Sequence, residues 1–241
     1  TQRQASLMQT AMGAGDALSG AGTSAALDGR GIGIAVLDSG IDFRHRNLLG
    51  TDGKSRMREA VDFVTLGRMT FLDAGWTGGR DYSPTIKSLT AAYFTWTGGA
   101  AAPLFARQPD AYGHGTAVAA VAAGAGSYQT PDSSGIASGA DLYDVRVLNE
   151  QGVGSLADVL AGIDWVIQRS KLANIRVMNL SLGAASTDSF LIDPLARAAR
   201  SAVAAGIVVV ASAGNAGKDE SGRGVYGAIS SPGHEPSVIT V

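Results

Sequence analysis

The sequence predicts an α/β fold in which a doubly wound parallel sheet carries helices on both faces, giving three layers (α/β/α). Short apolar runs that end at turn residues alternate with segments of helical periodicity along most of the 241 residues. Strands buried on both faces of a parallel sheet have such runs, and their alternation with helices indicates βαβ units. The composition, 45% hydrophobic and 17% charged, is that of a globular domain with a sizeable core.

Five apolar runs are predicted to be the strands. The first, residues 32–37, ends at Asp38-Ser39-Gly40, where turn residues stop the run. The others are residues 142–148, 175–180, 207–211 and 238–241. Because ligands of such sheets bind outside the carboxyl ends of the strands, polar residues at these ends are the first candidates for a site.

Three segments are predicted to be helices. Residues 115–123 are rich in alanine and valine, and residues 155–169 place apolar side chains on one helical face. Ser155 and Asp158 have the spacing of a capping box at the start of the second segment. Residues 194–205 are followed by Gly206, a residue typical of the position after a helix C-terminus.

The chain is predicted to comprise an N-terminal arm and one domain. Residues 1–30 are polar, glycine-rich and weakly patterned, and we interpret them as the arm. Residues 31–241 carry the strand–helix alternation. Residues 65–109 interrupt it with aromatic side chains among glycines and prolines, which predicts a surface insertion with some β structure.

Several classes of function are disfavoured by composition. A net charge of −2 gives no electrostatic footprint for nucleic acid or an anionic membrane. The absence of cysteine excludes disulfides, thiolate metal sites and a cysteine nucleophile. The longest apolar run, residues 202–213, is too short to span a bilayer. A nucleotide-binding Rossmann domain has the same βαβ pattern, but its glycine-rich phosphate loop is missing.

Three short motifs carry the candidate chemistry. They are VLDSGID at residues 36–42 with Asp38, YGHGTAVA at residues 112–119 with His114, and ASAGN at residues 211–215 with Asn215. In this order, and on this alternation of strands and helices, they resemble the subtilisin-like serine peptidases from about residue 31 to residue 241. The resemblance implies a subtilisin-like fold and a serine endopeptidase with an Asp-His-Ser triad.

The residue types suit acyl transfer. A neutral imidazole at His114 can take the proton of a serine, and a carboxylate at Asp38 can hold Nδ1–H and fix the tautomer. The amide of Asn215 can donate to the oxyanion of a tetrahedral intermediate. Taken singly, the aspartate fits a turn, the histidine a helix start and the asparagine a left-handed turn position. The three motifs in order favour the catalytic interpretation.

The resemblance also implies where a polypeptide binds in extended conformation. Two segments pair with it as edge strands: Gly152, Val153 and Gly154, and Ser181, Leu182 and Gly183. Glycine gives the access to the main chain that such pairing needs. The pocket for the P1 side chain, which precedes the scissile bond, is walled by the second segment, by Ala213 and Gly214, and by residues 231–233. These walls are uncharged, so an uncharged P1 residue is expected.

No metal site is predicted. Relatives often bind calcium through an acidic residue after the aspartate motif, whereas Asn47 occupies that region here, and residues 124–138 offer no cluster of ligands. Calcium therefore lacks identifiable ligands. No cofactor is expected.

The family's nucleophile motif, Gly-Thr-Ser-x-Ala at a helix start, is not found after the last predicted strand. We interpret Gly22-Thr23-Ser24 as a coincidence, because no strand precedes it. The serine is expected on a C-terminal segment of the same precursor, and residues 1–241 alone are expected to be inactive. The alternative is a pseudopeptidase that binds extended peptides without cleaving them. The resemblance implies a secreted or periplasmic protein. The sequence opens at Thr1 with neither an initiator methionine nor a signal-peptide core, so a processed or trimmed N-terminus is expected.

Overall fold

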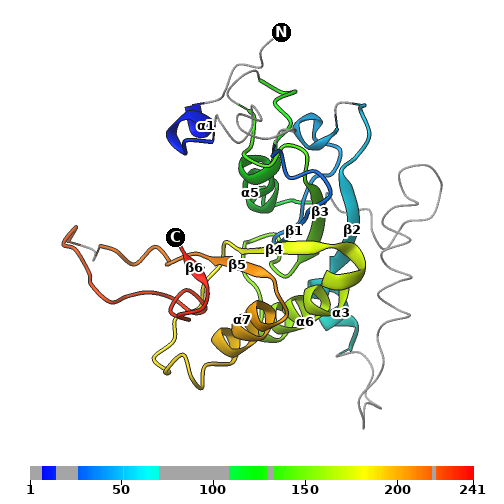
Figure 1. The fold of residues 1–241 in the computed structure, drawn as a ribbon. Helices are drawn as coiled ribbons and strands as arrows, with labels where there is room; N and C mark the ends of the chain where they lie inside the picture. The colour runs from blue at the N-terminus through cyan, green and yellow to red at the C-terminus, as the bar shows by residue number, and fades with distance from the viewer. Residues whose placement is uncertain (1–6, 15–26, 51, 71–108, 130–132, 219–220) are drawn as a thin grey trace.

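A computed structural model of the chain describes residues 7–14, 27–50, 52–70, 109–129, 133–218 and 221–241 (Figure 1). Within these ranges, six strands form one parallel sheet in the order β2-β3-β1-β4-β5-β6. The strands are β1 (Gly33–Asp38), β2 (Met57–Asp62), β3 (Asp141–Arg146), β4 (Ile175–Leu180), β5 (Val208–Ala211) and β6 (Ile239–Thr240). The helices are α1 (Leu7–Ala11), α3 (Phe63–Thr70), α5 (His114–Ala123), α6 (Leu156–Ala173) and α7 (Pro194–Ala204), with a 3-10 turn, η1 (Arg46–Leu48).

Helices cover both faces of the sheet (Figure 1). On one face, Ala119 and Ala123 of α5 pack against β1 and β3 through Val36 and Leu142. On the other face, α3, α6 and α7 contribute the larger apolar cluster, which includes Leu37 of β1. The predicted three-layer α/β/α fold is confirmed.

The central strand β1 is buried along its whole length, with β3 on one side and β4 on the other. Its register with β3 runs from Gly33 opposite Asp141 to Asp38 opposite Arg146. A strand in this position can present its last residue to a site while its backbone is held from both sides. Asp38 is that residue.

The predicted strands and helices agree with the structure to within a few residues at each end. Ser155 begins α6 as predicted, since its Oγ accepts a hydrogen bond from the N–H of Asp158 at 3.1 Å. Gly206 follows α7 with φ of 88°.

Besides the short α1 and η1, the sequence analysis did not predict β2 and α3. The first lies at the edge of the sheet and carries Arg58 and Glu59, so its apolar run is interrupted. The second overlaps the predicted insertion at residues 65–109, whose first six residues are helical rather than irregular. Residues 71–108 of that insertion lie outside the described residues.

The arm at residues 1–30 contains the short helix α1 and contacts the domain. Gln9 is buried and donates from Nε2 to the carbonyl oxygen of Gly135 at 2.7 Å. The Gly22-Thr23-Ser24 stretch lies outside the described residues. The division into an arm, a domain and an insertion stays a prediction. Among the residues that the structure describes, no helix has the length and apolar character to cross a membrane.

Candidate active site

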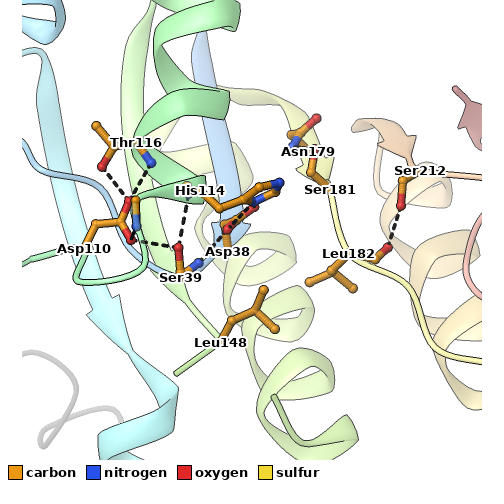
Figure 2. Close-up of polar contacts among 12 residues, drawn as sticks. Asp38, Ser39, Asp110, His114, Thr116, Leu148, Asn179, Ser181, Leu182 and Ser212 are labelled. Atoms are coloured by element: carbon orange, nitrogen blue, oxygen red, sulfur yellow. Dashed lines mark hydrogen bonds and ion pairs between the residues drawn. The ribbon is translucent and has the colours of Figure 1, made fainter. Parts of the chain in front are cut away.

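Asp38 and His114 meet at the carboxyl end of the sheet (Figure 2). The Nδ1 atom of His114 lies 2.8 Å from Oδ1 and 2.9 Å from Oδ2 of Asp38. The side chain of Asp38 is fully buried, whereas that of His114 is 43% exposed. Because Nδ1 donates to the carboxylate, Nε2 is left to accept a proton on the accessible side.

The first turn of α5 approaches the end of β1 closely because residue 115 is a glycine. A β-carbon on Gly115 would lie 2.2 Å from the carbonyl oxygen of Gly40 and 3.0 Å from Cβ of Asp38. Any larger residue would push the helix away from the strand and separate His114 from its carboxylate. The glycine that follows the histidine therefore sets the distance between the pair.

Asp110 anchors the loop that leads into α5, and the sequence analysis did not identify it. Its Oδ1 accepts hydrogen bonds from Gly113 N at 2.8 Å and from Ser39 Oγ at 2.8 Å. Its Oδ2 accepts from Thr116 N at 2.8 Å and from Thr116 Oγ1 at 2.6 Å (Figure 2). A carboxylate at a helix N-terminus accepts hydrogen bonds from free N–H groups, and its negative charge interacts favourably with the helix dipole. The Asp-x-x-Gly-His spacing was the signal that could have revealed it.

The predicted substrate segment Ser181–Gly183 continues β4 past the end of β1. Val36 of β1 is opposite Asn179, so Ser181 lies at the level of Asp38 (Figure 2). Ser212, which follows β5, donates from its N–H to Leu180 O at 3.1 Å and from Oγ to Leu182 O at 2.9 Å. The segment after β4 is thus joined to the segment that contains Ala213 and Gly214.

The other predicted substrate segment, Gly152 to Gly154, follows a tight loop. Asn149 donates its N–H to Val153 O at 2.8 Å, and its Oδ1 accepts from Val153 N at 3.0 Å. Both main-chain polar groups of Val153 therefore face Asn149. Val153 and Gly154 are exposed.

Ser230, which the sequence analysis did not assign to the predicted P1 pocket, lies close to two of its predicted glycines. A β-carbon built on Gly183 would lie 2.3 Å from Ser230 Oγ, and one on Gly214 would lie 2.8 Å from it. The N–H of Ser230 donates to Ala213 O at 2.9 Å. The neighbouring Ser231 pairs with Ala184 and is buried. Ser230 thus lies between two of the predicted walls, and only its contacts in space reveal this.

Asn215 is exposed in the loop after β5, directly after Gly214. Within the described part of the chain, no hydrogen bond joins it to His114 or Asp38. Its predicted partner is an oxyanion, so its role stays a prediction.

The comparisons with known proteins decide the family. A sequence model of the subtilase family (peptidase S8) matches residues 29–241. The chain belongs to the subtilase family. The resemblance inferred from the three motifs is confirmed.

This subtilase is similar to known serine proteases over part of their length. The serine protease AprX of Bacillus subtilis is 42% identical over 137 residues, which are 55% of this chain and 30% of that protein. Subtilisin DY of Bacillus licheniformis is 37% identical over 132 residues, or 55% of this chain and 43% of that protein. The solved structure of sphericase has a TM-score of 0.58 and 26% identity, covering 88% of this chain and 53% of that one. The chain thus spans about half the length of that solved relative and less of the curated ones.

The region in which relatives often bind calcium, around Asn47 and the loop after α5, is filled here by the protein's own polar side chains. Asn47 Oδ1 accepts from Gly126 N at 2.9 Å, and its Nδ2 donates to Ser133 O at 2.7 Å, so both amide atoms are engaged. The buried guanidinium of Arg56 donates to the carbonyl oxygens of Ala140, at 3.0 Å, and Ala123. A cation is therefore already present beside these carbonyls. No group of three or more His, Cys, Asp or Glu side chains in the described residues suits a metal ion. The residues here do not fit calcium.

Proposed function

We propose that this chain is part of a serine endopeptidase that hydrolyses peptide bonds through an Asp-His-Ser triad. Asp38 orients His114, His114 acts as general base and then general acid, and Asn215 donates to the oxyanion. The nucleophilic serine belongs to a segment of the protein outside residues 1–241. Membership of the subtilase family supports the reaction class.

One observation carries the proposal. A fully buried carboxylate accepts from Nδ1 of an imidazole that is itself 43% exposed. A buried carboxylate needs hydrogen-bond partners, and Asp38 has two, the imidazole and the N–H of Ser39 at 2.7 Å, so it holds the ring in a fixed orientation. If α5 needed only a cap at its N-terminus, Asp110 would be enough, so capping does not explain why Asp38 contacts His114.

The substrate is proposed to be an extended polypeptide that pairs with Gly152 to Gly154 on one side and with Ser181 to Gly183 on the other. The exposure of Val153 and Gly154 supports the first pairing. The second segment is joined through Ser212 to the loop that contains Ala213 and Gly214, which supports a P1 pocket between them.

The test is active-site labelling of the full-length protein with a fluorophosphonate, which reacts with activated serines. We expect one labelled serine, mapped by peptide sequencing to a segment outside residues 1–241. His114→Ala should abolish labelling, and Asp38→Asn should lower kcat by about 10⁴. Asn215→Ala should lower kcat by about 10²–10³, the range known for the corresponding donor of a subtilisin.

Other outcomes identify other functions. A folded full-length protein that binds extended peptides but is not labelled would be a pseudopeptidase. A label on Ser24 would contradict the assignment of the nucleophile to a segment outside residues 1–241.

We also propose that the protein is secreted or periplasmic. The support is similarity to a Thermus protein named extracellular serine proteinase, 38% identical over 110 residues, which are 46% of this chain and 23% of that protein. Immunodetection in culture medium and cell fractions tests this proposal.

A further inference from the structure

A buried guanidinium lies at the C-terminal end of the helix that carries His114. Arg56, the residue before β2, is 7% exposed. It donates from Nη1 to the carbonyl oxygen of Ala140 at 3.0 Å, and from Nη2 to that of Ala123, the last residue of α5. A longer contact, at 3.5 Å, joins Nη2 to the main-chain carbonyl oxygen of Asn47 in η1. We call these three carbonyl oxygens, which come from three separate segments, the carbonyl cradle.

The loop after α5 is folded tightly onto this end of the helix. A β-carbon on Gly124 would lie 2.5 Å from Asn47 Nδ2 and 2.5 Å from Ser133 O. One on Gly135 would lie 2.4 Å from Gly124 N. The N–H of Ala125 donates to Asn47 O at 2.7 Å, and that of Gly135 donates to Gly124 O at 2.8 Å. Buried carbonyl groups that converge in this way need donors or a cation among them, and the guanidinium supplies both.

The positive charge of Arg56 persists at neutral pH. Burial lowers the pKa of its guanidinium, whereas the carboxylates of Asp141 and Asp28 act in the opposite direction. A guanidinium stays protonated in proteins, since its ordinary pKa is about 12.5 or higher. Its place at the end of α5 is also the one at which a positive charge interacts favourably with the helix dipole. The same cation thus stabilises the helix that presents His114 at its other end.

The oxygen atoms gathered here are of the kind that calcium binds, but a side chain of the protein already neutralises them. Relatives often bind calcium through an acidic residue in the region that Asn47 occupies here. The Nδ2 of Asn47 donates to Ser133 O at 2.7 Å. The side chain at this position therefore turns a donor toward the loop, where a carboxylate would offer a second acceptor to a metal ion.

We propose that Arg56 is the built-in structural cation of this subtilase. Its guanidinium takes the place of a calcium ion in the carbonyl cradle and holds the loop after α5 against the helix. The C-terminal end of the helix that carries His114 should therefore stay anchored in a medium without calcium. This inference concerns the fold, so it does not depend on the reaction that the protein catalyses.

Hydrogen exchange in the full-length protein, followed at the amides of Ala125 and Gly135, tests the inference. For the wild type, we expect the same rates in millimolar calcium and in EDTA. Arg56→Met removes the charge and keeps the aliphatic part, so both amides should exchange at least about tenfold faster, the loss expected for one charge-assisted hydrogen bond. Arg58→Met is the matched control. Arg58 is 54% exposed and pairs with Asp141 at 2.8 Å outside the cradle, so its loss should leave both rates close to the wild-type values.

A double variant should convert the carbonyl cradle into a calcium site. Asn47→Asp with Arg56→Ser removes the guanidinium, supplies a carboxylate and frees Ser133 O from its donor. Millimolar calcium should then slow exchange at Ala125 and Gly135 by at least about tenfold relative to EDTA, as expected for a site with the affinity of extracellular calcium modules. This variant provides the test where Arg56→Met does not fold.

Three results would overturn the inference. Faster exchange of the wild type in EDTA than in calcium would show that a metal ion holds the loop. Equal rates in Arg56→Met and the wild type would show that the guanidinium is not needed there. A double variant whose exchange does not respond to calcium would show that the carbonyl cradle is not a cation site.

Discussion

The hydroxyl of Ser230 is buried and has no hydrogen-bond partner in the part of the chain that the structure describes. Such a group costs about 1–3 kcal/mol in the absence of a partner. Ser230 lies against Gly183 and Gly214, so a rotation of its side chain toward the proposed P1 pocket would let a polar atom of the P1 side chain become its partner. In the proposed pocket, the hydroxymethyl group would also limit how far a large side chain enters.

Two matched substitutions at Ser230 separate polarity from size. Ser230→Ala should lower kcat/KM for glutamine at P1, relative to leucine, by about 3–10-fold, the value of one hydrogen bond. Ser230→Gly should in addition raise kcat/KM for phenylalanine at P1. The measurement is hydrolysis of substrates that differ only at P1. A P1 preference that is the same in both variants and the wild type would remove Ser230 from the pocket.

Asp144 is a buried carboxyl beneath the loop that follows β1. Burial raises its pKa well above the ordinary value, although the N–H of Ile41 donates to Oδ2 at 3.1 Å and acts in the opposite direction. The folded protein therefore holds this proton more tightly than the unfolded chain, whose pKa is about 3.9. The resulting stability is fully present below the unfolded pKa and is lost as pH rises through the folded pKa.

Asp144→Asn should remove this pH dependence. The amide stays neutral, so the free energy of unfolding at pH 7–8 should rise by on the order of 1 kcal/mol relative to the wild type. The gain should shrink as the pH falls toward 4. Urea denaturation across this pH range measures it, with the exposed Asp188→Asn as control. A variant less stable than the wild type at pH 8 would show that the carboxylate is held charged.

Among the helices and strands, α5 has the most direct influence on the site, because it carries His114 in its first turn. Asp110→Ala should lower the free energy of unfolding by about 1–2 kcal/mol, the usual cost of a lost N-terminal cap. It should also slow fluorophosphonate labelling, because the loop before His114 loses its anchor. Ser155→Ala is the matched control, since it removes the cap of α6 and should lower stability without changing labelling. Equal labelling rates in both variants would show that Asp110 only stabilises the helix.

The sequence predicted the elements that have a clear pattern. Buried strands such as β1 are continuous apolar runs, and α6 shows one apolar face with a cap at Ser155. The edge strand β2 escaped prediction because Arg58 and Glu59 break its run, and this hid α3 as the helix that follows it.

For the molecule as a whole, local motifs predicted the residues that meet at the site better than they predicted its walls. Asp38 and His114 stand in motifs whose spacing is visible in the sequence, and the fold brings them together. Tyr112 with Gly152, and Ser230 with Gly183, are contacts between distant segments that no local pattern reports. They depend on how the loop before α5 meets the loop after β3, and on how the loops after β4 and β5 converge, so they required the fold.

The described part of the sheet has an open edge at β6. Within the described residues β6 pairs only with β5, and its neighbourhood is apolar and accessible, with Ile239 54% and Val241 74% exposed. An apolar strand edge of this kind is a template for further pairing. Since the chain covers 53% of the sphericase structure, we expect another segment of the full-length protein to cover this edge.

Hydrogen exchange at the amide of Thr240 tests whether this edge is covered. Val241 N–H donates to Ala211 O in β5, so by alternation the N–H of Thr240 points to the outer side. In the full-length protein, hydrogen exchange at Thr240 should be at least about a hundredfold slower than at an unprotected amide. Gly222, in an exposed loop, is the fast reference, and Val36 in the central strand is the slow one. Exchange at Thr240 as fast as at Gly222 would mean that the edge stays open in the complete protein, and that the sheet ends at β6.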